Sequence, residues 1–191
     1  GQESAKRAVW YGIAGMALAV AATLAGPGAG LWWLSAVLII GGGLVGASLA
    51  IALERLGLDV AMVEATPEGA LPAVFDQRNL SFAEATVNAL GALGVLPLLR
   101  APTGSIRRIH ASRAGDFGRV RLEARAHGRE EFGRVVVARD FGEALEARLA
   151  QLPRLVRYRP ARFVGLAGDG NGLRRVRIAD AQGERDVSTR L

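Results

Sequence analysis

The spacing of charged residues divides the chain into a long apolar beginning and a more polar remainder. No charged residue occurs between Arg7 and Glu54, and residues 8–25 are mostly apolar. The length of this apolar run, the two positive charges before it and the aromatic residues near its start are typical of a membrane-spanning helix. We therefore expect an apolar N-terminal segment with this helix over residues 1–35, and a separate domain over residues 36–191.

Two other interpretations of the N-terminal segment are open. The small residues before Gly26 are compatible with a secretory signal peptide, although export conflicts with the nucleotide-binding pattern described below. Residues 1–35 are also compatible with a segment foreign to the domain behind them, through a fusion or a misplaced gene start.

From Ala36 onward the pattern is that of an α/β protein. Residues 36–40 and 59–64 are continuous apolar runs rich in β-branched residues, which is typical of buried parallel strands. Between them, residues 44–56 have the pattern of a helix, and Gly57 ends it. Strand, helix and strand in this order predict a Rossmann-type core.

The rest of the domain is predicted to form an antiparallel β insert with two more helices. Capping-box patterns at Ser81–Glu84 and Asp140–Glu143 predict helices that run to about Leu93 and Leu152. Strands are expected over residues 106–112, 119–123, 135–138 and within 155–191, with a turn at residues 169–172.

Composition excludes several classes of site and partner. The chain has no cysteine and two histidines, His110 and His127, so a thiolate site is impossible and we expect no metal. The net charge of +6 comes from the arginine-rich second half. Such a half favours phosphates or anionic lipids. Nucleic acid is not expected, because no aromatic residues are interleaved with the arginines to stack on bases.

A glycine-rich turn between the first strand and helix carries the functional argument. The sequence GGGLVG fits G-x-G-x-x-G, with its glycines at Gly41, Gly43 and Gly46. The first allows a tight turn, the second lets a pyrophosphate approach the backbone, and the third lets the helix pack closely. The N–H groups of Leu44 and Val45 begin the helix, where its dipole favours phosphate.

Glu64 completes the dinucleotide-binding pattern. It ends the second predicted strand, 18 residues after Gly46, close to the expected spacing of about 20 residues. A carboxylate there accepts both ribose hydroxyls of an adenosine and repels a 2′-phosphate. We therefore expect FAD or NAD rather than NADP as the bound nucleotide. A solvated carboxylate at a strand end is the alternative interpretation of Glu64.

The same glycines allow a different interpretation. Gly42-x-x-x-Gly46 and Gly46-x-x-x-Ala50 are small-xxx-small patterns, so residues 8–53 are compatible with a two-helix membrane hairpin followed by a binding module. This alternative does not account for the β pattern that follows or for the spacing of Glu64.

From Val37 to Leu191 the sequence resembles the ubiquinone-biosynthesis flavin hydroxylases, most closely the octaprenyl-methoxyphenol hydroxylase branch of the p-hydroxybenzoate hydroxylase class. The segments that carry the resemblance are VLIIGGGLVGASLAIALERLGLDVAMVE (37–64), FDQRNLS (75–81), ALGALGV (89–95) and VVVARDFGEALEARL (135–149). The first is common to many flavoproteins, whereas the second and fourth narrow the choice.

The resemblance implies an FAD-dependent monooxygenase that uses NAD(P)H and O₂ to hydroxylate a prenylated phenol ring. By this analogy Arg78 lies beside the ribityl–phosphate part of the flavin, and Arg139 reaches the pyrophosphate. Arginine suits both places because its planar fork pairs bidentately with phosphate. Ordinary surface arginines are the alternative for both. Asp76 either orients Arg78 by a local ion pair or caps a turn. The catalytic residues stay unknown, because no acid–base set stands out. Another FAD- or NAD-linked oxidoreductase is the alternative.

The resemblance also bears on location and extent. We expect membrane association at the cytoplasmic face of the bacterial inner membrane, since Lys6 and Arg7 orient the apolar helix. A complex of quinone-biosynthesis enzymes is a candidate partner. Segments that complete the flavin and reductant sites in the family are expected beyond Leu191, so we expect an FAD-binding domain that is incomplete at its C-terminus. Residues 1–35 have no counterpart in the family.

Overall fold

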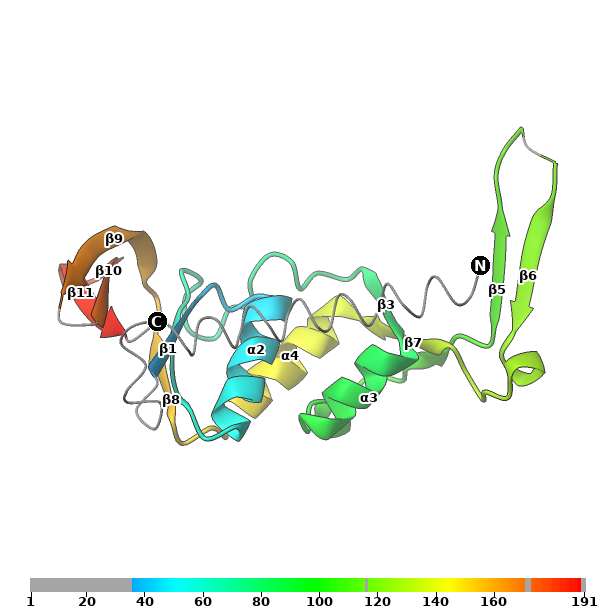
Figure 1. Cartoon of the computed structure of the whole chain (residues 1–191), viewed down its shortest axis with the longest axis horizontal. Coiled ribbons are helices and arrows are strands. Elements are labelled where there is room, and N and C mark those ends of the chain that lie inside the picture. The colour runs from blue at the N-terminus through cyan, green and yellow to red at the C-terminus, as the bar shows by residue number, and fades with distance from the viewer. Residues whose placement is uncertain (1–35, 116, 171–172, 190–191) are drawn as a thin grey trace. The chain divides into compact units, whose positions relative to one another are not determined.

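The computed structural model describes residues 36–115, 117–170 and 173–189 (Figure 1). The apolar helix expected over residues 8–25 lies outside these ranges. Within them, none of the helices combines the length and the apolar character needed to cross a membrane.

A small parallel sheet and its connecting helix form the centre of the fold. The unit consists of β1 (Ala36–Ile40), α2 (Leu44–Arg55), β2 (Asp59–Val63) and β8 (Leu155–Tyr158). The strands are parallel in the order β1-β2-β8, with Ala36 opposite Asp59 and Val60 opposite Leu155. The expected Rossmann-type strand–helix–strand unit is therefore confirmed.

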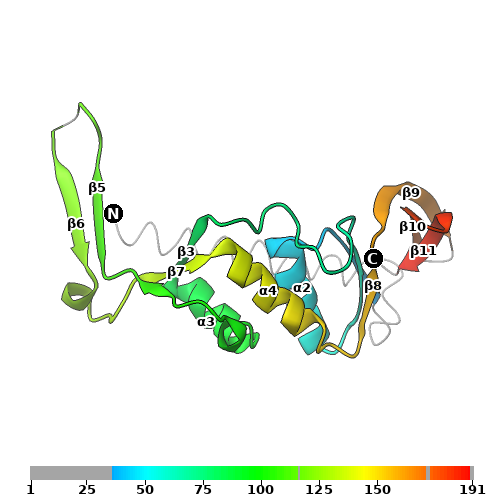
Figure 2. The same ribbon diagram turned by 180° about the vertical axis from the view of Figure 1, so that it is seen from behind.

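The main hydrophobic core lies where α2 packs against this sheet and against α4 (Ala138–Leu149). The two helices lie side by side (Figures 1 and 2). Small residues on α2, Ala47 and Ala50, are fully buried and let larger side chains of α4 approach, among them Phe141 and Leu145. Burying these apolar surfaces is the main source of stability for this unit.

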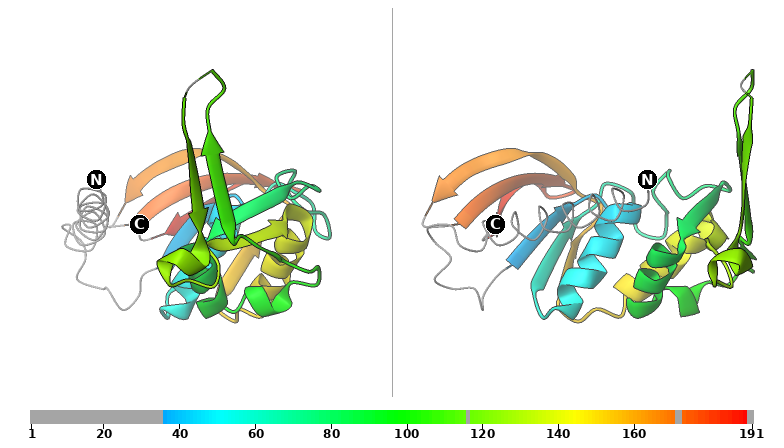
Figure 3. Two further views of the ribbon diagram at one scale, coloured as in Figure 1. Left: turned by 90° about the vertical axis from the view of Figure 1, so that its right-hand side faces the viewer. Right: turned by 45° about the vertical axis from the view of Figure 1, so that its right-hand side comes forward.

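The remaining elements form three antiparallel groups, as the right-hand view of Figure 3 shows. The first contains β3 (Asn79–Ala83), α3 (Glu84–Ala92), η2 (Leu96–Leu98), β4 (Gly104–Ser105) and β7 (Gly133–Val137), with strand order β3-β7-β4. The second is the hairpin of β5 (Arg108–Ser112) and β6 (Arg119–Glu123), followed by η3 (Ala124–His127). The third is the meander β9 (Arg162–Gly170), β10 (Leu173–Asp180) and β11 (Gly183–Thr189).

The antiparallel insert is confirmed, but both predicted capping boxes are wrong. Ser81 lies inside β3, and α3 begins at Glu84 without a side-chain cap. Asp140 lies in the first turn of α4, whose N-cap residue is Val137. Both helices start directly where a strand of the β3–β7 pair ends, so the pairing of the strands, and not a capping side chain, fixes where each helix begins.

The alternative of a membrane hairpin over residues 8–53 is also wrong in its second half. Residues 36–40 form a strand that pairs with β2, and the helix after the glycines has 12 residues. A membrane-spanning helix needs about 20 residues. Of the residues in the small-xxx-small pattern, Ala50 is instead buried in the core and Gly46 packs against the carbonyl of Gly41.

Candidate cofactor-binding site

The turn between β1 and α2 needs glycine at two of its three motif positions for reasons visible in the backbone. Gly41 has φ +96°, in the left-handed region that side chains disfavour, and its N–H donates to the carbonyl of Val63 at 2.8 Å. A Cβ on Gly46 would overlap the carbonyl oxygen of Gly41. The first and third glycines therefore fold the start of α2 tightly onto the end of β1.

Gly43 and the first residues of α2 leave an open place for an anion. Gly43 is the N-cap of α2, no side chain caps the helix, and its first turn carries no acidic residue. The N–H groups of Leu44 and Val45 belong to the first turn of the helix, where N–H groups have no acceptor within the helix. They therefore stay available to a ligand, along with the positive end of the helix dipole. A Cβ on Gly43 would meet only Val74, at 3.8 Å. This open, uncapped end fits a pyrophosphate.

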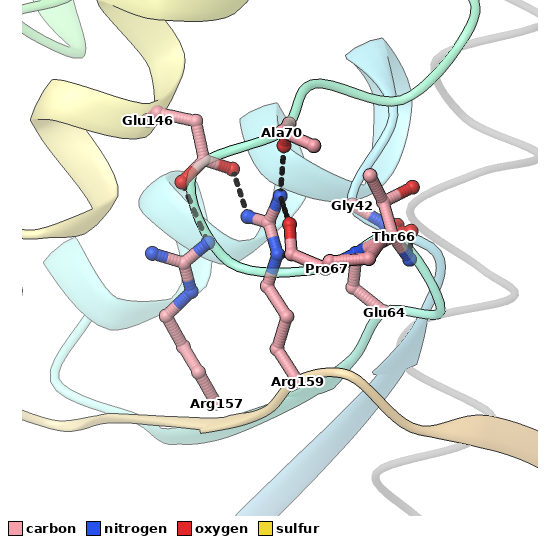
Figure 4. Close-up of polar contacts among 8 residues, drawn as sticks. All are labelled: Gly42, Glu64, Thr66, Pro67, Ala70, Glu146, Arg157 and Arg159. Carbon is pink, nitrogen blue, oxygen red and sulfur yellow. Dashed lines mark hydrogen bonds and ion pairs between the residues drawn. The ribbon is translucent and has the colours of Figure 1, made fainter.

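Glu64 lies directly beside this turn (Figure 4). Its residue is 7% exposed, and its carboxylate accepts hydrogen bonds from the N–H of Gly42 and from the N–H of Thr66, the latter at 2.6 Å. Its main chain is held by the carbonyl of Tyr158 and the N–H of Ala161. The interpretation of Glu64 as a solvated strand-end carboxylate is therefore wrong.

The surroundings of Glu64 keep its carboxyl group ionised. Burial is the largest single influence and raises its pKa, but hydrogen bonds from Thr66 and Gly42 and the positive charge of Arg159 lower it. The lowering influences prevail, so the pKa of Glu64 lies below its usual value. An ionised carboxylate only accepts hydrogen bonds, which suits a pair of ribose hydroxyls.

Arg78 and Arg139 lie on adjoining segments although they are far apart in the sequence. The N–H of Arg139 donates to the carbonyl of Asp76, and the N–H of Ala138 donates to the carbonyl of Arg78, both at 2.8 Å. The Arg78 guanidinium pairs with Asp76 (Nε to Oδ2, 2.6 Å), and the N–H of Arg78 donates to Asp76 Oδ1 at 2.9 Å, so Asp76 makes the ion pair and also caps the turn. Both arginine side chains are exposed, so they are open to an anion.

A cleft of about 830 Å³ connects Arg139 to the loop that follows Glu64. Its lining residues are Gly69, Ala70, Leu71, Pro72, Ala73, Phe75, Asp76, Arg100, Arg139, Glu143 and Glu146. Val74 of this loop is also the neighbour of Gly43. The loop thus lies between the glycine turn and the cleft, whereas Arg78 is not among the lining residues.

The comparison with protein families identifies the family of this chain. The model of a family described as "FAD binding domain" matches residues 35–191. The chain belongs to this FAD-binding family. The glycine turn, the uncapped end of α2 and Glu64 lie within the matched residues.

Curated relatives agree with the expected resemblance to ubiquinone-biosynthesis flavin hydroxylases. The chain is 33% identical to ubiquinone hydroxylase UbiL of Rhodospirillum rubrum over 138 residues, which are 72% of this chain and 32% of that protein. It is 28% identical to the protein slr1300 of Synechocystis sp. over 155 residues, 81% of this chain and 37% of that protein. The chain thus spans about a third of the length of the curated relatives it matches.

Solved structures share the fold. The p-nitrophenol 4-monooxygenase PnpA from Pseudomonas putida has a TM-score of 0.64 at 18% identity, over 81% of this chain and 39% of that one. The anhydrotetracycline hydroxylase OxyS from Streptomyces rimosus has a TM-score of 0.62 at 22% identity, over 81% of this chain and 30% of that one. At these identities the likeness shows the FAD-binding fold alone.

Several residues around the glycine turn and the cleft were not expected from the sequence. Gly42 occupies a variable position of the motif, yet a Cβ there would lie 2.9 Å from Glu64 Oε2. Glu146 and Arg159 join α4 to the loop after Glu64. No sequence signal marks these three residues, because their roles depend on contacts between segments that are distant along the chain. His110 and His127 are exposed.

Proposed function

We propose that this chain is the FAD-binding part of a monooxygenase that hydroxylates a prenylated phenol ring in ubiquinone biosynthesis. The observation that carries the FAD assignment is the placement of the buried Glu64 carboxylate beside the uncapped N-terminus of α2. The 33% identity to a ubiquinone hydroxylase supports the choice of reaction.

In this proposal the chain binds and orients the cofactor. The N–H groups of Leu44 and Val45 and the dipole of α2 hold the pyrophosphate. Glu64 accepts the two ribose hydroxyls of the adenosine, and Arg139 approaches the phosphates from the cleft. Bound FAD would supply the oxygen chemistry itself, so the protein contributes mainly placement and electrostatics.

The overall reaction needs a reductant and oxygen. NAD(P)H, a proton, O₂ and the phenol give NAD(P)⁺, water and the ring carrying one added hydroxyl. One oxygen atom enters the ring and the other leaves as water, with the two electrons supplied by NAD(P)H. The substrate is proposed to be a prenylated phenol because the relative that supports the reaction is named a ubiquinone hydroxylase.

Two measurements test the proposal. The chain should bind FAD, and ADP should compete with FAD for the site. FMN, which lacks the adenosine half of FAD, should not bind. The protein expressed from its gene should couple oxygen-dependent NAD(P)H oxidation to a mass gain of one oxygen on a prenylated phenol. Tighter binding of NAD than of FAD would instead favour an NAD-linked oxidoreductase and contradict the proposal.

We also propose that residues 8–25 attach the protein to the cytoplasmic face of the bacterial inner membrane, where its substrate and other quinone-biosynthesis enzymes would be available. Their apolar length and the positive charges of Lys6 and Arg7 support this. In flotation with neutral phosphatidylcholine vesicles, the chain should float and a variant lacking residues 1–34 should not. Equal behaviour of the two would contradict the anchor, and flotation of the variant only with anionic vesicles would assign binding to its arginines.

A further inference from the structure

The loop after Glu64 is held by one side chain from another part of the fold. Arg159 follows β8, and its side chain is 5% exposed. Its guanidinium donates to the carbonyls of Thr66 (Nε, 2.8 Å), Pro67 (Nη2, 3.0 Å) and Ala70 (Nη2). A loop without regular structure is thereby fixed at three carbonyls.

The same guanidinium is anchored by a carboxylate on α4. Arg159 Nη1 lies 2.7 Å from Glu146 Oε1, and Arg157 Nη2 lies 2.6 Å from Glu146 Oε2 (Figure 4). With Glu146, four of the five N–H donors of Arg159 have partners. Burial of so fully bonded a charge fixes its position, because any movement leaves donors unpaired.

Arg159, with its bonds to Glu146 and to the three loop carbonyls, forms a clamp. The clamp acts on Thr66, the residue that orients the Glu64 carboxylate. Thr66 donates its N–H to Glu64 Oε1, and the carbonyl of the same residue accepts from Arg159. The main chain of Glu64 is bonded to Tyr158 and Ala161, on either side of Arg159 and its neighbour. The positive charge of Arg159 also lowers the pKa of Glu64, as does the hydrogen bond from the N–H of Gly42 in the glycine turn.

We propose that Arg159, anchored by Glu146, is a positioning residue that holds Glu64 and the loop of residues 66–70 in the geometry that binds the adenosine ribose of FAD. The inference rests on the proposed role of Glu64 toward FAD. It adds that Arg159, which lies outside the dinucleotide-binding motif, sets the affinity of the site for FAD. Residues 69 and 70 also line the cleft, so the clamp shapes one wall of the cleft as well.

Arg157 provides a matched control. It shares the Glu146 carboxylate with Arg159 and is partly buried, but its buried Nε has no hydrogen-bond partner. Arg157→Gln therefore removes an ion pair to Glu146 and leaves the bonds to the loop. Arg159→Gln removes the ion pair and the bonds to the loop together. Arg159→Lys keeps the positive charge near Glu64 but lacks the planar fork that reaches several carbonyls.

The first experiment measures the chain without cofactor. The pKa of Glu64, followed by carboxyl-carbon NMR, should move toward its ordinary value in Arg159→Gln, move less in Arg159→Lys, which keeps the charge but loosens Thr66, and stay low in Arg157→Gln. Amide exchange of Thr66 and Ala70, whose N–H groups donate hydrogen bonds in this segment, should quicken in both Arg159 variants and stay unchanged in Arg157→Gln. These readouts need no bound FAD, and a general loss of stability would not separate the variants in this way.

The second experiment titrates each variant with FAD. Arg159→Gln should bind about tenfold more weakly than the unaltered chain, the effect of losing charge-assisted hydrogen bonds behind the site. Arg159→Lys should recover part of the loss, and Arg157→Gln should stay within about threefold of the unaltered chain. Equal behaviour of Arg159→Gln and Arg157→Gln in both experiments would overturn the inference. Failure of the unaltered chain to bind FAD would overturn the proposed function, while the NMR comparison would still decide the role of Arg159.

Discussion

At the scale of single residues, Glu64 shows how position changes the chemistry of a side chain. A glutamate at the end of a strand is ordinarily hydrated, but here the residue is buried and two backbone N–H groups donate to its carboxylate. These hydrogen bonds keep the carboxylate ionised and oriented before FAD binds, and a nucleotide ribose would share or take over its acceptor sites.

We expect Glu64→Gln to weaken FAD binding by about 1–3 kcal/mol, the usual effect of losing hydrogen bonds to a charged acceptor. The exposed Glu68, in the loop after Glu64, offers a control of the same residue type, and Glu68→Gln should leave the affinity unchanged. Flavin-fluorescence titration of both variants measures the difference. Equal affinities would remove Glu64 from the FAD site.

FAD binding should also respond to acid through Glu64. Because the pKa of Glu64 is lowered in the folded chain, its carboxylate contribution is complete above the ordinary pKa of 4.5 and is lost as the pH falls through the lower folded value. The affinity should therefore be flat between about pH 8 and pH 5 and decline only at more acid pH. Glu64→Gln should lack that part of the decline. Matching acid profiles for the two proteins would contradict the assignment.

A side chain at Gly43 should remove FAD binding without disturbing the fold. Gly43 has an ordinary φ of −70° and space for a Cβ, so Gly43→Val should keep the fold but lose FAD, because its side chain would occupy the place of the pyrophosphate. Circular dichroism and flavin content measured on one preparation test this. Retained flavin with an unchanged spectrum would show that the turn does not cradle a phosphate.

At the scale of elements, Gly46 belongs to the contact between α2 and the turn before it. Since a Cβ there would overlap the carbonyl of Gly41, Gly46→Ala should lower the free energy of unfolding by about 3 kcal/mol. Gly91 in α3 is the matched control, because a Cβ there meets only Leu96, at 3.6 Å. Gly91→Ala should stabilise the chain by about 0.5–1 kcal/mol. Urea denaturation measures both, and a Gly46→Ala variant as stable as the unaltered chain would disprove the close contact.

The elements that could be predicted from the sequence are those whose causes are local. Strand, glycine turn, helix and second strand follow one another within residues 36–64, so spacing alone located the turn and Glu64. The starts of α3 and α4 could not be predicted, because the pairing of β3 with β7 decides them. The carboxylate of Asp140 resembled a cap but accepts the N–H groups of Arg100 and Ala101, at 3.0 and 3.1 Å.

The same distinction explains the site. The glycine positions and Glu64 could be assigned from a motif, whereas the clamp of Arg159 on the loop depends on β8 pairing with β2. That pairing brings Arg159 beside a segment more than ninety positions earlier in the chain. Hydrophobic periodicity predicts strands but does not say which strands are neighbours.

At the scale of the whole molecule, the residues to which a role in FAD binding is proposed all belong to the site for the ADP half of the cofactor. In the part of the chain that the structure describes, the proposed function uses the glycine turn, the start of α2 and Glu64 for the ADP portion, with Arg139 for the phosphates. The curated relatives are about three times longer than the matched region. FAD affinity in this chain should thus come mainly from the nucleotide end.

We therefore expect the 191-residue chain to bind ADP almost as well as FAD, with FAD no more than about tenfold tighter and micromolar, on the order of −8 kcal/mol. The flavin ring is the largest apolar part of the cofactor, and it would add little binding free energy unless apolar side chains enclose it. Isothermal titration with FAD, ADP and FMN measures the contribution of each half. The Glu64→Gln variant is the control, since it should weaken ADP and FAD by the same factor. Nanomolar FAD binding together with ADP binding a thousandfold weaker would show that this chain itself encloses the flavin ring.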